Sequence, residues 1–172
     1  MDCAQTIEKE HELSDTEKLN DTWVLWGHLP HNTDWSLDSY INIATIKTVG
    51  QVVAINKSIP EKMIKNCMLF LMREGINPTW EDEKNINGGC FSFKIINKDV
   101  PSIWRQMVYL ICGETISNSK EFLERVNGIT ISPKKAFCIV KIWMSDIQCQ
   151  STAKITKIDN LSTHGCIFKK HK

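Results

Sequence analysis

The residues best suited to chemistry lie in one short stretch, INPTWEDEKN, at positions 76–85. It places an indole ring, Trp80, directly before three carboxylates, those of Glu81, Asp82 and Glu83. The face of a Trp ring attracts cations and stacks on flat nucleobases, which is worth roughly 1–3 kcal/mol per base. An ionised carboxylate only accepts hydrogen bonds. A ligand that satisfies both groups is a planar, cationic ring with N–H donors on its edge.

A guanine alkylated at N7 has these properties, because it carries delocalised positive charge and presents N1–H and N2–H side by side. Glu81 is suited to accept both hydrogens in a charge-assisted, bidentate contact. A second Trp from a distant loop would close a sandwich around the ring. An enzymatic alternative uses Glu81, Asp82 and Glu83 to hold Mg²⁺ in a phosphohydrolase. That alternative lacks an accompanying nucleophile, general base or glycine-rich phosphate loop.

Composition narrows the class of protein. The chain has 172 residues, 42% of them hydrophobic, and a net charge of +1, which indicates one globular domain and disfavours sequence-independent binding of long nucleic acids. No apolar run approaches membrane-spanning length, and the charged start MDCAQTIEKEHEL is unlike a signal peptide. The seven cysteines include no Cys-x-x-Cys pair. We expect a cytoplasmic protein with reduced cysteines and no cofactor.

The elements that must position the site are expected after a disordered leader at residues 1–18, within a single domain at residues 19–172. Strands are expected at 21–29, 35–46, 88–96, 136–144 and 166–172, and helices at 48–59, 99–114 and 117–128. Periodicity does not decide between helix and strand for the apolar run at 67–72. Because strands and helices do not alternate, we expect a mostly antiparallel sheet with helices on one face.

Particular residues support these elements. Thr48 is suited to cap the first helix, Pro101 to open the second, and Gly128 to end the third. In the strand at 136–144, the pleat puts Lys141 and Trp143 on the same face.

Four motifs in the same order resemble the translation initiation factor 4E family, whose members bind the cap of mRNA. They are WVLW at 23–26, TWEDEKN followed by GG, the helix from Trp104 to LICGE, and KIW at 141–143. The six tryptophans also fall at the family's usual positions. The resemblance implies an α+β fold: a curved antiparallel sheet of about eight strands, three helices on its convex face and a cap slot on its concave face.

The resemblance also implies roles for single residues. Trp35 and Trp80 would sandwich the 7-methylguanine, Glu81 would read N1 and N2, and Trp143 would contact the N7-methyl group. Asp82 is expected to fix its loop. His28 and His31, which precede Trp35, are expected to be solvated, and the alternative is that they approach the cap.

The phosphate-binding residues differ from the family pattern. Lys134 takes the place of an Arg, which keeps the charge but loses the bidentate fork. The family's second basic position is occupied here by Ile139. Lys135 and Lys141 are the candidates to replace it.

The surface that grips a partner helix in the family also differs. The family's Trp in the first helix corresponds to Val53, and two leucines of the neighbouring helix correspond to Arg105 and Tyr109. Leu19 and Val49 match the family. Since an apolar anchor cannot bury normally against Arg105, we expect the usual scaffold protein to bind poorly.

These residues predict a non-enzymatic protein that binds capped mRNA, is a monomer before partner binding and does not associate with membranes. It would act in translation initiation with an atypical scaffold partner. The alternative is a repressor that sequesters caps without recruiting the scaffold. The Ile-, Lys- and Asn-rich composition favours a protist or a large DNA virus as the source.

Overall fold

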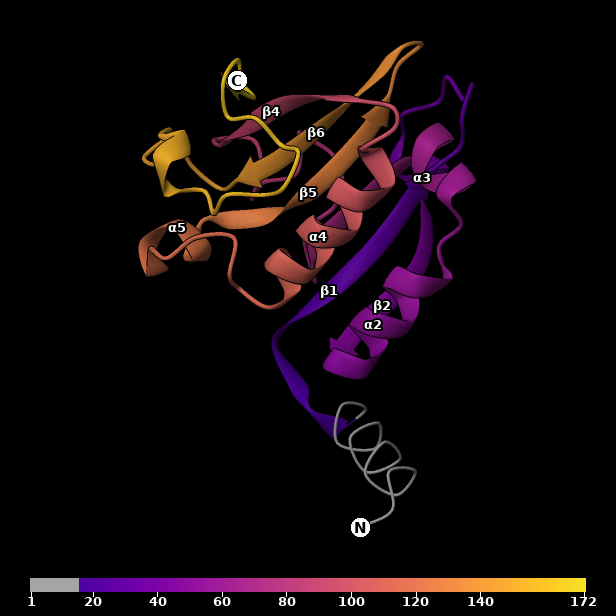
Figure 1. Cartoon of the computed structure of the whole chain (residues 1–172), viewed down its shortest axis with the longest axis horizontal. Helices are drawn as coiled ribbons and strands as arrows, with labels where there is room; N and C mark the ends of the chain where they lie inside the picture. Colours follow the sequence, from indigo (N-terminus) through magenta and orange to yellow (C-terminus); the bar gives the residue numbers. More distant parts are fainter. Residues whose placement is uncertain (1–15) are drawn as a thin grey trace.

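The computed structural model describes residues 16–172, in which seven strands form one curved antiparallel sheet in the order β2-β1-β3-β5-β6-β4-β7 (Figure 1). The strands are β1 (Lys18–His28), β2 (Ile41–Thr48), β3 (Met68–Arg73), β4 (Gly89–Ile96), β5 (Val126–Pro133), β6 (Phe137–Met144) and β7 (Ile167–Lys170). The predicted leader lies outside the described residues up to position 15, and β1 begins at Lys18.

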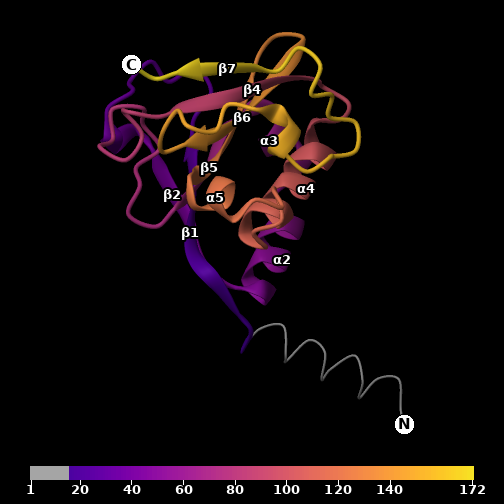
Figure 2. The same ribbon diagram turned by 90° about the vertical axis from the view of Figure 1, so that its left-hand side faces the viewer.

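Helices cover one face of this sheet. They are α2 (Val49–Ser58), α3 (Glu61–Asn66), α4 (Val100–Cys112) and α5 (Lys120–Glu124), with 3-10 turns η1 (Leu37–Ser39) and η2 (Thr152–Lys154). Figure 2 shows α2 and α4 together on one side of the sheet and β7 at its edge beside β4. The predicted α+β class is therefore confirmed. None of the helices within residues 16–172 is long and apolar enough to cross a membrane.

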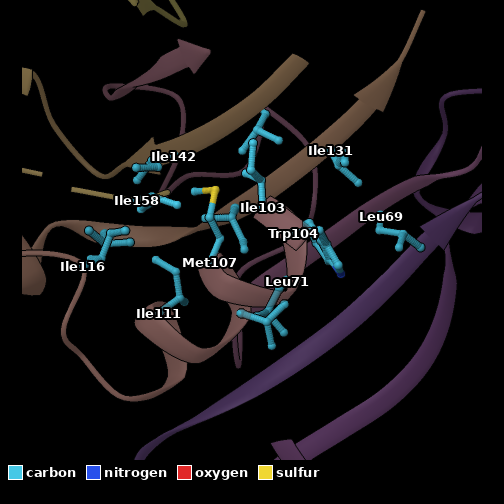
Figure 3. Close-up of a cluster of buried hydrophobic side chains, with 14 of the residues drawn as sticks. Leu69, Leu71, Ile103, Trp104, Met107, Ile111, Ile116, Ile131, Ile142 and Ile158 are labelled. Atoms are coloured by element: carbon cyan, nitrogen blue, oxygen red, sulfur yellow. The ribbon is translucent and has the colours of Figure 1, made fainter. Parts of the chain in front are cut away.

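The main core lies between the sheet and α4. Trp104 and Met107 of α4 point at Leu69 and Leu71 of β3 and at Ile142 of β6, as Figure 3 shows. These side chains are fully buried. Alternate residues of each strand supply this layer, so the residues between them face the other side of the sheet.

The helix ends follow the predicted chemistry. The Thr48 side chain accepts a hydrogen bond from the Gln51 backbone, and the Gln51 side chain accepts one from Thr48, which forms a capping box at the start of α2. Pro101 lies in the first turn of α4, and Gly113 follows its last residue.

The helix predicted at 117–128 is wrong over more than half of its length. Within that range only α5 (Lys120–Glu124) is helical, and Gly128, which was predicted to end the helix, lies inside β5. A Cβ on Gly128 would approach the Leu71 carbonyl oxygen to 2.3 Å, so glycine is required where β5 meets β3. Almost all of β5 is buried, so its residues lack the alternation of a half-exposed strand.

Two smaller differences concern neighbouring segments. The predicted strand at 35–46 begins only at Ile41, after η1, and α3 was not predicted. The ambiguous run at 67–72 is a strand, β3.

Candidate ligand-binding site

The concave face of the sheet carries a second apolar cluster. Phe70, Met72, Ile76 and Trp143 form it, and the partly buried Tyr40, Trp26 and Met68 pack against it. Phe70 and Met72 alternate with Leu69 and Leu71, which face the helices. Because no described helix lies on this cluster, it forms the floor of a candidate site.

The loop between β1 and β2 holds Trp35 at one side of this floor. The Asn32 side chain accepts a hydrogen bond from the Asp34 backbone at 3.0 Å, and the Asp34 side chain accepts one from the Ser36 backbone at 2.8 Å. Two such Asx turns fix the backbone on both sides of Trp35. The Ser36 backbone N–H also lowers the pKa of Asp34. Trp35 is thus presented with 53% of its surface exposed.

His28 lies against Trp35 and is not solvated as expected. Its ring is stacked on the indole with the centroids 4.2 Å apart and an interplanar angle of 1°, and it is only 2% exposed. His28 Nε2–H donates to the Asp34 carbonyl at 2.8 Å. The expectation was wrong because the loop that follows β1 folds back, so that Trp35 covers the His28 ring. His31 is exposed, as expected.

Tyr40 joins these rings to the floor. Its ring lies 5.2 Å from that of His28, 6.5 Å from that of Trp35 and 5.3 Å from that of Phe70. Burial raises the pKa of Tyr40, and the negative charge of Glu81 raises it further. Glu81 therefore lies close enough to Tyr40 to act on its ionisation.

The loop between β3 and β4 presents Trp80 and Glu81. Its centre is Asn85, which is fully buried. Asn85 Nδ2 donates to the carbonyls of Asn77 and Thr79 at 3.1 and 2.8 Å, and its Oδ1 accepts from Asn127 at 2.9 Å. These bonds tie the loop to itself and to β5.

Asp82 braces the same loop. Its two carboxylate oxygens accept from the backbone N–H groups of Asn77 at 3.0 Å and of Lys84 at 2.9 Å. The expectation that Asp82 fixes the loop is met by these bonds. Trp80, 49% exposed, and Glu81 remain free to face a ligand. Trp80 makes no ring contact within residues 16–172.

Trp143 is much more buried than Trp35 and Trp80. It is only 6% exposed, and the ring of His171 lies 4.8 Å from it at an interplanar angle of 57°. His171 Nδ1–H donates to the Asn85 carbonyl at 2.8 Å, and its backbone N–H donates to the Gly88 carbonyl at 3.0 Å. Burial lowers the pKa of His171, and the charge of Lys141 adds to this effect, while the bond to Asn85 opposes it.

The predicted basic residues fall into two places. Lys134 and Lys135 are exposed in the turn between β5 and β6, where they line a hollow of about 490 Å³ with His28 and Trp35. Lys141 is half-buried on the face of β6 that carries Trp143. The structure thus brings Lys134 and Lys135 to Trp35, and Lys141 to Trp143.

The predicted partner residues lie on the helix-covered side. Arg105 donates to the Ile59 carbonyl at 3.4 Å and lies 3.9 Å from the Glu61 carboxylate, so its guanidinium is directed at the start of α3. The Arg105 carbonyl accepts a hydrogen bond from Asn56 of α2. The remaining predicted partner residues are half-buried, apart from the exposed Tyr109: Leu19, Val49 and Val53.

The sequence alone did not identify Tyr40, Asn127 or His171 as parts of the site. Residue type gave no signal for them, because each acts through contacts with residues of other segments. As for metal binding, residues 16–172 contain no group of three His, Cys, Asp or Glu side chains placed to hold an ion.

Comparison with known proteins identifies relatives of this chain. A family model described as "Eukaryotic initiation factor 4E" matches residues 18–170. The initiation factor 4E of Eremothecium gossypii is 28% identical over 157 residues, covering 87% of this chain and 72% of that protein. The initiation factor 4E homolog of Acanthamoeba polyphaga mimivirus is 39% identical over 63 residues, covering 37% of this chain and 23% of that protein.

Solved structures share the fold. A schistosome initiation factor 4E in complex with m7GpppG and a 4E-binding protein aligns with a TM-score of 0.69 at 20% identity, covering 77% of this chain and 74% of that one. The Caenorhabditis elegans initiation factor 4E-3, in complex with the 4E-binding protein Mextli and a cap analog, aligns with a TM-score of 0.68 at 22% identity, covering 76% and 75%.

Proposed function

The chain belongs to the eukaryotic initiation factor 4E family, and from this premise we propose that it binds the 7-methylguanosine cap of mRNA. The family consists of binding proteins that are not enzymes. The solved relatives that carry cap analogs support the proposal. The observation that carries it is that two indoles, Trp35 and Trp80, are half-exposed on loops that are each braced by an Asp side chain.

In this proposal Trp35 and Trp80 stack on the two faces of the methylated base. Glu81, which is exposed beside Trp80, accepts the N1 and N2 hydrogens. Trp143, which is almost covered, would contact the methyl group through the small part of its side chain that remains accessible.

The lysines would hold the phosphates. Lys134 and Lys135 lie beside Trp35, and Lys141 lies beside Trp143, so the phosphate chain would meet positive charge at both ends of the slot. An ammonium lacks the planar fork of a guanidinium. We therefore expect the lysines to attract the phosphates by their charge without fixing the orientation of the phosphate oxygens.

For the partner surface, we propose a helix of non-standard sequence on the side formed by α2 and α4. Leu19, Val49 and Val53 supply apolar area there, and Tyr109 lies exposed on α4. The Arg105 guanidinium would oppose a purely apolar anchor.

In this proposal the protein acts in translation initiation in the cytoplasm, as a single domain at residues 19–172. The mimivirus relative supports a viral or protist source.

The direct test is titration with 7-methyl-GTP and with GTP, followed by tryptophan fluorescence. A desolvated cation–π contact is worth about 2 kcal/mol, so the methylated nucleotide should bind on the order of ten- to thirtyfold more tightly. Trp80→Ala should remove most of this affinity and leave the circular dichroism spectrum unchanged. Equal quenching by the two nucleotides would overturn the proposal.

Glu81→Gln tests the readout of the base edge. The change keeps the shape and removes the charge, so binding should weaken by more than about 1 kcal/mol. Glu83→Gln is the matched control, because Glu83 is an exposed carboxylate of the same loop. Binding that is lost equally in both variants would place the readout elsewhere.

The competing role, a repressor that sequesters caps, is favoured by the charge at Arg105. A pull-down distinguishes the two roles: capped RNA is incubated with this protein and a cell lysate, and the proteins that co-purify are identified. Recovery of ribosomal initiation components supports the initiation role, and their exclusion supports sequestration.

A further inference from the structure

Three neighbouring strands next to the slot carry charge of one sign only. None of the residues of β4, β6 and β7 is Asp or Glu. Each of these strands places one lysine on the concave face: Lys94 on β4, Lys141 on β6 and Lys169 on β7. We call these three residues the lysine strip.

The strand register brings the lysine strip together. Cys90 of β4 is paired with Trp143 on one side and with Lys169 on the other, so Lys169 lies in the cross-strand row of Trp143. Ser92, two residues further along β4, is paired with Lys141.

The next row along β4 contains Lys94, which is paired with Ile139. Side chains two residues apart share a face, so the whole strip projects from the face of Trp143. Strand spacing puts Lys94 about 8 Å from Lys141, and Lys141 about 12 Å from Lys169. Such separations are comparable with those between phosphates of an extended RNA strand.

Nothing described neutralises these charges. None of the three lysines forms an ion pair with a carboxylate of residues 16–172. Lys94 Nζ lies over the Phe137 ring, 4.4 Å from its centroid, and Lys169 is exposed. The positive charge therefore faces solvent or a ligand.

Apolar side chains lie beside the lysines on the same face. Ile96 and Ile167 are both more than half exposed, on β4 and β7 of this face, and Phe137 is partly exposed on β6. Surfaces that bind single-stranded nucleic acids combine basic groups for the backbone with flat or apolar groups for the bases.

We propose that the lysine strip binds the phosphates of the RNA nucleotides that follow the cap. The strip starts in the row of Trp143 and leads away from the slot over β4 and β7. This inference rests on the proposed function, since the cap would deliver the RNA to the strip. A net charge of +1 on the whole chain makes the strip a local feature, too small to hold RNA without the cap.

The test compares ligands of increasing length on the full chain: m7GpppG, a capped RNA of ten nucleotides and the same RNA without a cap. The capped decamer should bind more tightly than m7GpppG by about tenfold in low salt, and each phosphate contact should add about 0.7 to the slope of log K against log salt. The uncapped decamer should bind weakly.

The double variant Lys94→Ala, Lys169→Ala should abolish the advantage of the capped decamer and reduce the salt slope. It should leave the affinity for 7-methyl-GTP unchanged, because neither residue is assigned to the slot. Lys57→Ala, Lys62→Ala is the matched control, since both lysines are exposed on helices of the opposite side.

Equal affinities of the wild type for m7GpppG and the capped decamer would overturn the inference. Equal losses in the strip variant and the control would also overturn it. A wild type that fails to prefer 7-methyl-GTP over GTP would instead refute cap binding. In that case, capped and uncapped decamers that bound equally, and more weakly to the strip variant, would show that the lysine strip binds RNA independently of the cap.

Discussion

At the scale of single residues, the concave face is organised around Tyr40, whose ring approaches three aromatic neighbours. Its hydroxyl group also responds to the charge of Glu81. Tyr40 can therefore report where Glu81 lies without any ligand.

The protein has only two tyrosines, so Tyr109→Phe isolates the titration of Tyr40. In that background Glu81→Gln should lower the pKa of Tyr40, because loss of a negative charge makes tyrosinate easier to form. The pKa should stay above the ordinary value of 10.0, since burial is the larger cause of its rise. Ultraviolet absorbance of tyrosinate measures the shift. Glu83→Gln is the control, and a pKa unchanged by Glu81→Gln would mean that Glu81 points away from Tyr40.

The site residues that could be proposed from the sequence are those that stand next to one another in a single short segment. Trp80 next to Glu81 suggests a base sandwich from residue type alone. His171 could not be found this way, because its bond to the Asn85 carbonyl joins positions 86 residues apart. His28 was misjudged for a similar reason, since its environment is set by a loop that folds back over β1.

At the scale of elements, the loop between β3 and β4 is held by buried amide side chains and not by Trp80 or Glu81. Asn85 bonds to two carbonyls within the loop and to Asn127 of β5. The orientation of Trp80 thus depends on a buried amide five residues away in sequence.

Asn85→Ala should lower the free energy of unfolding by about 1–3 kcal/mol for each partner left unsatisfied. The affinity for 7-methyl-GTP should also fall, although Trp80 and Glu81 are unchanged. Urea unfolding and the nucleotide titration measure the two effects. Asn87→Ala, an exposed position of the same loop, should change neither. Normal affinity in Asn85→Ala would show that the loop holds its shape without this amide.

His171, which follows β7, should make the stability of the protein depend on pH. The pKa of His171 is lowered, chiefly by burial, so the folded state favours the neutral ring and the unfolded state binds the proton more readily. The resulting stabilisation is complete above the ordinary pKa of 6.5 and is lost as the pH falls toward the folded-state value. Urea unfolding at pH 7.5 and at pH 5.5 should therefore show a loss in the wild type that His171→Gln reduces. An identical loss in both would assign the effect to other groups.

Elements whose residues alternate or carry caps could be predicted, and α2, α4 and β6 fall close to their expected positions. β5 could not, because a strand that is buried on both faces shows no alternation. Its Gly128 was taken as a helix end, whereas it is a site of close approach to β3.

At the scale of the whole molecule, the main core and the proposed binding site lie on opposite faces of one sheet. The helix-covered face buries the large side chains, and the concave face presents exposed rings. Changes on the two faces should then be independent.

Met107→Ala, in the core between α4 and the sheet, should lower the free energy of unfolding by about 2–5 kcal/mol. Its affinity for 7-methyl-GTP should stay within twofold of the wild type while the protein is folded. Trp80→Ala should show the reverse pattern. In the double variant the effects on unfolding should add within about 0.5 kcal/mol. A larger deviation, or a loss of affinity in Met107→Ala alone, would show that the faces are coupled.

The imidazole stacked beneath Trp35 has a consequence for the thermodynamics of recognition. An indole that is immobilised during folding has already lost its rotameric freedom, which otherwise costs about 0.5–1.5 kcal/mol when a ligand arrives. Trp80 has no such neighbouring ring among the described residues. If the two indoles stack on a base as proposed, their contributions would be unequal: Trp35 would offer a ring that is already held in place, and Trp80 would bear most of the entropic cost of binding.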